Sequence, residues 1–123
     1  MARQLIEAQR RYLRLNGKYF KEADRLLEKD DLPQASEKFW GAMAEAIKAV
    51  AVARGKRLGR HKNLSRFVQE LHREHPEWKL PLLFAAGEAL HTNFFEDHYA
   101  KELVSIYGEA TKQFVDLLKR LIS

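Results

Sequence analysis

The feature that most constrains the fold of this chain is the spacing of its apolar residues. Between residues 100 and 121 they recur in steps of three and four, at Ala100, Leu103, Tyr107, Ala110, Phe114, Leu117 and Leu121. This spacing places them along one side of a helix with 3.6 residues per turn. No stretch of the sequence alternates apolar and polar residues as a half-buried strand does. The sequence therefore predicts an all-α fold, with a long amphipathic helix in this segment.

Two long helices are expected earlier in the chain. The first is predicted from Arg3 to Lys29, with Asn16-Gly17 as the one place where it can bend. Asp31 is suited to cap the second, because Gln34 follows three residues later, and Gly55 after Arg54 is suited to end it. The expected buried stripe of the second helix is Ala35, Phe39, Met43, Ala46, Ile47 and Val50.

Two short helices are expected between these and the last. Asn63 is suited to cap one that buries Leu64, Phe67, Val68 and Leu71 and ends at His75, before Pro76. Pro81 is suited to the first turn of the other, and Asp97 to cap the final helix. The sequence thus predicts an up-and-down bundle of three long and two short helices.

Length and composition narrow the class of protein. The 123 residues fit a single domain, 1–123, and the absence of cysteine suits a cytoplasmic protein. The most apolar window, Ala42 to Ala53, contains Glu45 and Lys48 and is too short to span a bilayer, so no membrane association is expected. Phosphate-loop and dinucleotide glycine patterns are absent, and we expect no cofactor. His72 and His75 alone are weak evidence for a metal site, and none is predicted.

The positive charge of the chain is concentrated in one segment. The bases that we expect to bind a phosphate group lie in and beside the loop Gly55 to Lys62: Arg54, Lys56, Arg57, Arg60, His61, Lys62 and Arg66. Glu70 is the one acid between residues 54 and 73. A second basic group, from Arg3 to Lys21, is followed closely by acids from Glu22 onward, and we regard only the first as distinctly basic. Such a loop either binds the phosphates of a nucleic acid or nucleotide, or is a solvated connection.

The stretch HTNFFEDHYAKE, residues 91–102, contains a second group of candidates. His91, Asn93, Glu96 and His98 supply acid-base and hydrogen-bonding groups at a corner between helices. A histidine pair can activate a ribose 2′-hydroxyl and protonate the leaving oxygen. In the structural alternative, Asn93 and Glu96 bond the free backbone groups of the corner.

Two segments carry a resemblance to a known family. DDLPQASEKFWGAMAEAIKAVAVARG, followed later by ALHTNFFED, resembles the archaeal PaREP family of small helical proteins, a branch of the HEPN superfamily. The resemblance implies a bundle of four or five helices that is usually a homodimer, and partners among nucleotides, RNA and nucleotidyltransferase-type proteins. Catalytic members of the superfamily are metal-independent ribonucleases with an arginine, often followed by asparagine, and a histidine four to six residues later. Asn93 and His98 match that pattern here, but Thr92 or His91 stands where the arginine is expected.

Three functions are compatible with these features. We favour a non-enzymatic helical module that binds nucleic-acid backbone or nucleotide phosphate through the basic loop, because the missing arginine removes electrostatic help to a cleavage reaction. The alternative is a toxin-like, metal-independent ribonuclease that uses His98 and His91. A third is a protein-interaction scaffold, because DLPQASEKFWGA looks like a single tetratricopeptide-type unit.

Overall fold

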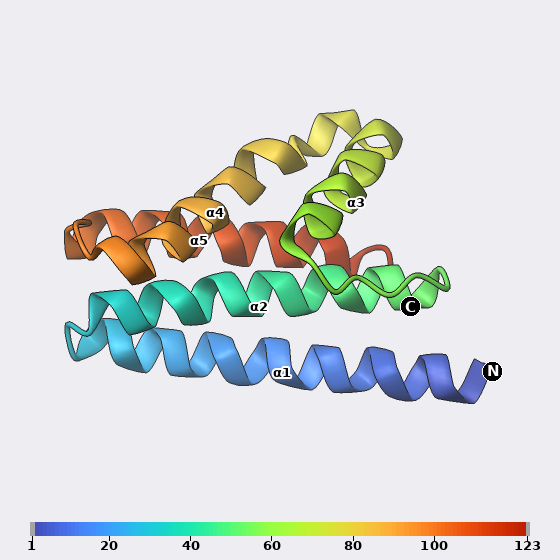
Figure 1. Cartoon of the computed structure of the whole chain (residues 1–123), viewed down its shortest axis with the longest axis horizontal. Coiled ribbons are helices and arrows are strands. Elements are labelled where there is room, and N and C mark those ends of the chain that lie inside the picture. Colours follow the sequence, from blue (N-terminus) through green and yellow to red (C-terminus); the bar gives the residue numbers. More distant parts are fainter. Residues whose placement is uncertain (1, 123) are drawn as a thin grey trace.

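The computed structural model describes residues 2–122, which form five α-helices and one short 3-10 helix. The α-helices are α1 (Ala2–Glu28), α2 (Leu32–Ala53), α3 (His61–Glu74), α4 (Leu80–Glu96) and α5 (Lys101–Lys119), and the 3-10 helix is η1 (Pro76–Trp78). No strand occurs within these residues, so the all-α prediction is confirmed. Figure 1 shows α1, α2 and α5 running side by side, with α3 and α4 inclined across them. The central helix α2 contacts each of the other four α-helices.

The first two helices form an antiparallel hairpin, as the predicted up-and-down connection requires. Asp31 caps α2 as expected, since its side chain accepts a hydrogen bond from the Gln34 backbone N–H at 3.3 Å. All six residues of the predicted stripe on α2 are buried. The first helix continues through Asn16-Gly17 without a break. Asn16 is buried there, and its Nδ2 donates to the Ala42 carbonyl at 2.6 Å, which joins α1 to α2.

The third helix buries the four apolar residues that the sequence indicated, Leu64, Phe67, Val68 and Leu71. Its start differs from the prediction, because α3 begins at His61 and Asn63 does not cap it. Arg60 holds the N-cap position in an extended conformation, and its carbonyl accepts from the Asn63 and Leu64 N–H groups. No side chain caps this helix, so the first N–H groups of α3 have no side-chain acceptor.

The corner between α4 and α5 also differs from the prediction. Asp97 does not cap the last helix; it ends α4 in the left-handed conformation, with φ 47° and ψ 55°. Ala100 holds the N-cap position of α5, without a side-chain hydrogen bond. A non-glycine residue in the left-handed region is uncommon, although aspartate tolerates it better than most. The left-handed Asp97 therefore turns the chain out of α4 before α5 begins.

The buried side of α5 was predicted incorrectly by about one residue. The buried residues of α5 are Val104, Gly108, Thr111, Phe114, Val115 and Leu118, so only Phe114 of the predicted line is fully enclosed. Gly108 explains the shift, because a Cβ at this position would lie 2.7 Å from the Phe39 ring. Thr111 is tolerated in the core since its hydroxyl donates to the Gly108 carbonyl at 2.6 Å. The sequence pattern was built from apolar side chains alone, so it did not predict that Gly108 and Thr111 would be buried.

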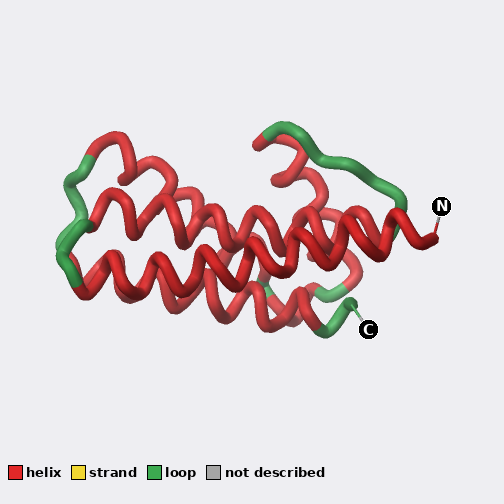
Figure 2. The backbone as a smooth tube through the Cα atoms, turned by 90° about the horizontal axis from the view of Figure 1, so that it is seen from below, coloured by secondary structure: helices red, strands yellow, loops and turns green. Residues whose placement is uncertain are grey.

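The connections lie at two ends of the bundle. In Figure 2 the α1–α2 turn and the α4–α5 connection are close together at one end, and the longer α2–α3 loop lies at the other, near the N-terminal end of α1. The basic loop and the corner at residues 91–102 are therefore at different places in the fold. None of the helices within residues 2–122 is long and apolar enough to cross a membrane.

Candidate functional site

The basic loop begins at a well-defined helix end. Gly55 adopts a φ of 77°, which only glycine adopts readily, and its N–H donates to the Val52 carbonyl. The Lys56 N–H donates to the Ala51 carbonyl at 2.9 Å, completing the Schellman pattern of helix termination. The chain thus leaves α2 in a fixed direction at the start of the basic loop.

Two of the loop's cations are bound to acids of α3. The Arg54 guanidinium donates to both carboxylate oxygens of Glu74, at 2.7 and 2.8 Å, and Lys56 Nζ lies 2.8 Å from Glu70 Oε2. The hydrogen bond from Arg54 lowers the pKa of Glu74, and the same bond raises the pKa of Arg54. These pairs hold the loop against α3, so Arg54 has a positioning role here. The sequence missed the partner of Arg54, because Glu74 lies just beyond the basic segment.

Of the other predicted bases, Arg57 and Arg66 line a hollow between the loop and α3, and Arg60, His61 and Lys62 lie outside its lining. The hollow has a volume of about 390 Å³ and is lined by Lys56, Arg57, Leu58, Asn63, Arg66, Phe67 and Glu70, which we call the basic hollow. Within residues 2–122, Arg57, Arg60, Lys62 and Arg66 make no ion pair. Glu70, the one acid of the lining, is already neutralised by Lys56. The basic hollow therefore keeps an excess of positive charge.

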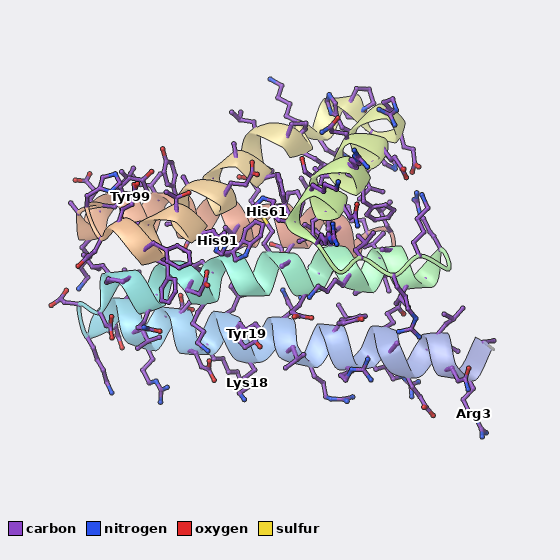
Figure 3. All side chains as sticks on the ribbon, viewed as in Figure 1. Arg3, Lys18, Tyr19, His61, His91 and Tyr99 are labelled. Atoms are coloured by element: carbon purple, nitrogen blue, oxygen red, sulfur yellow. The ribbon has the colours of Figure 1, made fainter. Side chains whose placement is uncertain are left out.

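A cluster of histidine, tryptophan and glutamate lies between α2, α3 and α4. The His61 Nε2 lies 2.8 Å from Glu88 Oε2, and the His91 Nδ1 lies 2.8 Å from Glu37 Oε1. Both imidazoles stack on Trp40, with ring centroids 4.8 and 4.9 Å from the indole. Figure 3 shows His61 and His91 beside each other above α2. The sequence assigned these two histidines to different sites, and the fold brings them together.

The two imidazoles occupy the same face of the indole. Their ring centroids are 5.8 Å apart, whereas rings stacked on opposite faces would be separated by at least about 7 Å, twice the usual stacking distance. Their side chains are 41% and 30% exposed, so solvent reaches both. Within residues 2–122 the second ring nitrogen of each, Nδ1 of His61 and Nε2 of His91, makes no hydrogen bond. Each histidine is thus oriented by a carboxylate and keeps one nitrogen available for acid-base chemistry.

The comparisons with known proteins identify the family of the chain. The model of the archaeal PaREP1/PaREP8 family matches residues 11–115. The chain belongs to this family. A crystal structure of a protein from Sulfolobus solfataricus has the same fold, with a TM-score of 0.78 and 25% identical residues over 89% of this chain and 97% of that one. No curated protein matches the chain significantly.

In this PaREP1/PaREP8 chain His91 is the corner candidate that joins the histidine cluster, and Asn93, Glu96 and His98 do not. Asn93 is fully buried, and its Oδ1 accepts from the His98 and Tyr99 backbone N–H groups at 2.9 and 3.0 Å. These bonds are those of the structural alternative, and the Asn93 Nδ2 also donates to Ser36 Oγ on α2 at 3.0 Å. Glu96, the other residue of that alternative, makes no side-chain hydrogen bond to the backbone within residues 2–122. His98 is 55% exposed and lies 3.5 Å from Glu96. The neighbouring Tyr99 lies near the end of the bundle in Figure 3, away from His61 and His91.

Glu37, Trp40 and Glu88 were not singled out in the sequence. A local signal exists for each pair, because Glu37 and Trp40 are three residues apart, as are Glu88 and His91, and such residues share a helical face. The contacts that build the cluster nevertheless join different helices, which spacing along one helix does not reveal. No three His, Asp or Glu side chains within residues 2–122 are grouped closely enough to hold a metal ion.

Proposed function

We propose that this protein is a non-enzymatic module that binds phosphate groups, of a nucleic-acid backbone or of a nucleotide, in the basic hollow. The observation that carries the proposal is the excess charge there, since Arg57 and Arg66 line a hollow of about 390 Å³ whose one acid is paired with Lys56. Guanidinium groups suit phosphate because they present several N–H donors in a planar fork.

The start of α3 adds to this preference for an anion. Arg60 provides no side-chain cap, so the first N–H groups of the helix are not satisfied by a side chain. These N–H groups and the helix dipole favour a negative charge. Asn63 and Arg66, which line the hollow, lie in the first turns of the same helix.

The HEPN resemblance supports RNA or a nucleotide as the ligand, and we include a homodimer and a nucleotidyltransferase-type partner in the proposal. Four large apolar side chains within residues 2–122 remain exposed and do not line the basic hollow: Ile6 by 48%, Leu82 by 70%, Phe95 by 72% and Ile106 by 55%. These side chains are available to a protein interface, which requires that some of them form one continuous patch.

A titration with labelled RNA in the presence of a chelator tests the proposal. We expect the double variant Arg57→Glu with Arg66→Glu to weaken binding by about tenfold or more, because two cations next to the phosphate become anions. The matched control is Lys119→Glu with Arg120→Glu, which makes the same change of net charge at exposed positions on the end of α5. Equal loss of affinity in both double variants contradicts a site in the basic hollow.

The contact between His61 and His91 favours a second candidate function, a metal-independent ribonuclease. In that reaction one imidazole takes the proton of a ribose 2′-hydroxyl, and the 2′-oxygen attacks the neighbouring phosphorus. The bond from phosphorus to the 5′-oxygen breaks, and the other imidazole protonates that oxygen, leaving a 2′,3′-cyclic phosphate and a 5′-hydroxyl. The side-by-side rings, each with a glutamate, support the pair His61 and His91 in place of His98 and His91.

Cleavage of an RNA pool with chelator present tests the second candidate. If the pair is His61 and His91, alanine at either position abolishes cleavage and His98→Ala retains it. Loss in His98→Ala with retention in His61→Ala supports the pair inferred from the sequence instead. RNA that is neither bound nor cleaved contradicts both candidate functions and favours a protein-interaction scaffold.

A further inference from the structure

The outer face of α1 carries a line of cations. Arg10, Arg14, Lys18, Lys21 and Arg25 are all exposed, and their spacing of three and four residues puts them on one side of the helix, which we call the basic stripe. Figure 3 shows Lys18, from this stripe, pointing away from the bundle, whereas Tyr19 points toward α2. At 1.5 Å per residue the stripe extends over about 22 Å.

Two acids near the C-terminal end of this stripe, Glu22 and Asp24, are paired with cations of other helices. Glu22 Oε2 lies 2.9 Å from Lys38 Nζ on α2, and the hydrogen bond from Lys38 lowers the pKa of Glu22. Asp24 accepts from Lys112 Nζ on α5 at 2.8 and 3.0 Å. The contact of Glu22 with Lys18 in the stripe is longer, at 3.9 Å. The stripe therefore retains most of its charge.

Gly17 lies within the stripe, and the fold of this chain does not require a glycine there. Apart from its chain neighbours and the backbone of its own helix, no atom of residues 2–122 lies within 4 Å of a Cβ built at Gly17, which is exposed. At Gly87 and Gly108, by contrast, a Cβ would meet Met43 or Phe39. A glycine inside a helix is unfavourable for helix formation, so an exposed one without a packing reason points to something outside the chain that approaches closely. Gly17 also helps to line a hollow of about 720 Å³ together with Arg14, Lys18, Lys21 and other neighbours.

The charge and the side chains that line this hollow indicate which kind of ligand it binds. Its lining is Leu13, Arg14, Gly17, Lys18, Lys21, Glu22 and Arg25, with no aromatic ring on which a base can stack. A second hollow of about 350 Å³, lined by Glu7, Arg10, Arg11 and Arg14, extends the surface along the same helix. A second copy of α1 would bring like charges together, which is unfavourable. A long polyanion whose bases are already stacked has the complementary charge and length.

We infer that the outer face of α1 binds along the sugar-phosphate backbone of a nucleic-acid duplex, with closest approach at Gly17. This surface shares no residue with the basic hollow. The inference goes beyond the proposed function, because it assigns a second binding surface, on α1, to an extended duplex. The contacts are with backbone phosphates, so binding is independent of base sequence and strongly dependent on salt.

The test is the binding of a fluorescent RNA duplex of mixed sequence to the full chain over a series of salt concentrations. In the triple variant Arg14→Gln, Lys18→Gln and Lys21→Gln, the slope of log K against log salt becomes shallower by about 0.9 for each lost contact. The matched control Arg73→Gln, Lys119→Gln and Arg120→Gln removes the same charge elsewhere and keeps the slope. Gly17→Gln weakens duplex binding several-fold while raising the melting temperature, which shows that the loss does not come from unfolding.

The outcomes separate this inference from the proposed function. An unchanged slope in the stripe variant, or unchanged affinity in Gly17→Gln, overturns the inference even where Arg57→Glu with Arg66→Glu abolishes binding. A shallower slope in the stripe variant supports the inference even where the variant of the basic hollow binds normally, which refutes the proposed function alone. A dimer of the wild type that becomes a monomer in Gly17→Gln also overturns the inference, because the occupant is then a second copy.

Discussion

Two groups of cations lie on different elements of the fold, one in the loop between α2 and α3 and one on α1, and Figure 1 shows the course of these elements. In the loop, Arg54 and Lys56 are bound by Glu74 and Glu70, so part of the charge serves to hold the loop in place. On α1 Glu22 and Asp24 are bound by lysines of other helices, and the cations of the basic stripe remain exposed to solvent. The number of bases in a segment is therefore a poor measure of the charge available to a ligand, because long-range pairing decides which charges remain.

The largest effect is expected at a residue outside both basic groups. Asn93→Ala removes the acceptor of the His98 and Tyr99 N–H groups and a donor to Ser36. Leaving such groups without partners lowers the free energy of unfolding by about 2–4 kcal/mol. Urea denaturation measures this change. The folded variant binds RNA like the wild type, and a weaker binding with unchanged stability would place the ligand at the corner instead.

The charge of the basic hollow can be raised by one substitution. Glu70→Gln removes the one acid of the lining and releases Lys56, so RNA affinity is expected to increase by about tenfold, or 1.4 kcal/mol. A filter-binding titration at fixed salt measures it. Glu109→Gln, on the exposed face of α5, is the matched control. No gain in Glu70→Gln means that phosphates do not enter the basic hollow.

On α1, releasing an acid from its lysine is expected to lower the affinity for nucleic acid. Lys38→Met leaves Glu22 without its closest cation, so a negative charge returns beside the basic stripe. We expect duplex affinity to fall about threefold, less than 1 kcal/mol, because the group is near solvent. Lys48→Met, also on α2, is the matched control, since Lys48 pairs with Glu45 instead. Equal duplex affinities of Lys38→Met and Lys48→Met would show that the charge of Glu22 does not affect binding at the basic stripe.

The smallest effect concerns pH and the pair that holds the loop. The pKa of Glu74 is lowered in the folded state, so its contribution is present above its ordinary value of 4.5 and is lost as the pH falls through the lower folded value. Because Arg54 and Glu74 are 36% and 43% exposed, the contribution is below about 1 kcal/mol. Thermal unfolding of wild type and Arg54→Met measures it. The two curves should converge as acid is added, and a constant difference down to pH 3 would show that Arg54 acts through packing.

The fold was largely predictable because apolar spacing and helix-end residues are local signals. The stripe of α2 and the inward residues of α3 follow from spacing alone, and Asp31 caps α2 as its sequence context indicates. The errors occur where local rules were overridden. Asn63 and Asp97 are ordinary capping residues that do not cap α3 or α5, and Gly108 is buried because the Phe39 ring of another helix needs its space.

The candidate sites were less predictable because they depend on contacts between helices. The residues of the basic hollow were named from the sequence, but the pairing of Arg54 with Glu74 was not. The sequence placed His91 beside His98, whereas the fold places it beside His61 on Trp40. The acids from Glu22 onward made α1 seem less than distinctly basic, because nothing in the linear sequence shows that Lys38 binds Glu22 and that Lys112 binds Asp24.

The most direct test of the central claim, that unpaired cations of this chain bind phosphate backbone, is the affinity of the wild type for an RNA duplex over a series of salt concentrations, with chelator present. The account predicts that log K falls linearly with log salt, with a slope of about −0.9 for each phosphate contact. An affinity independent of salt, or no binding at low salt, would contradict it.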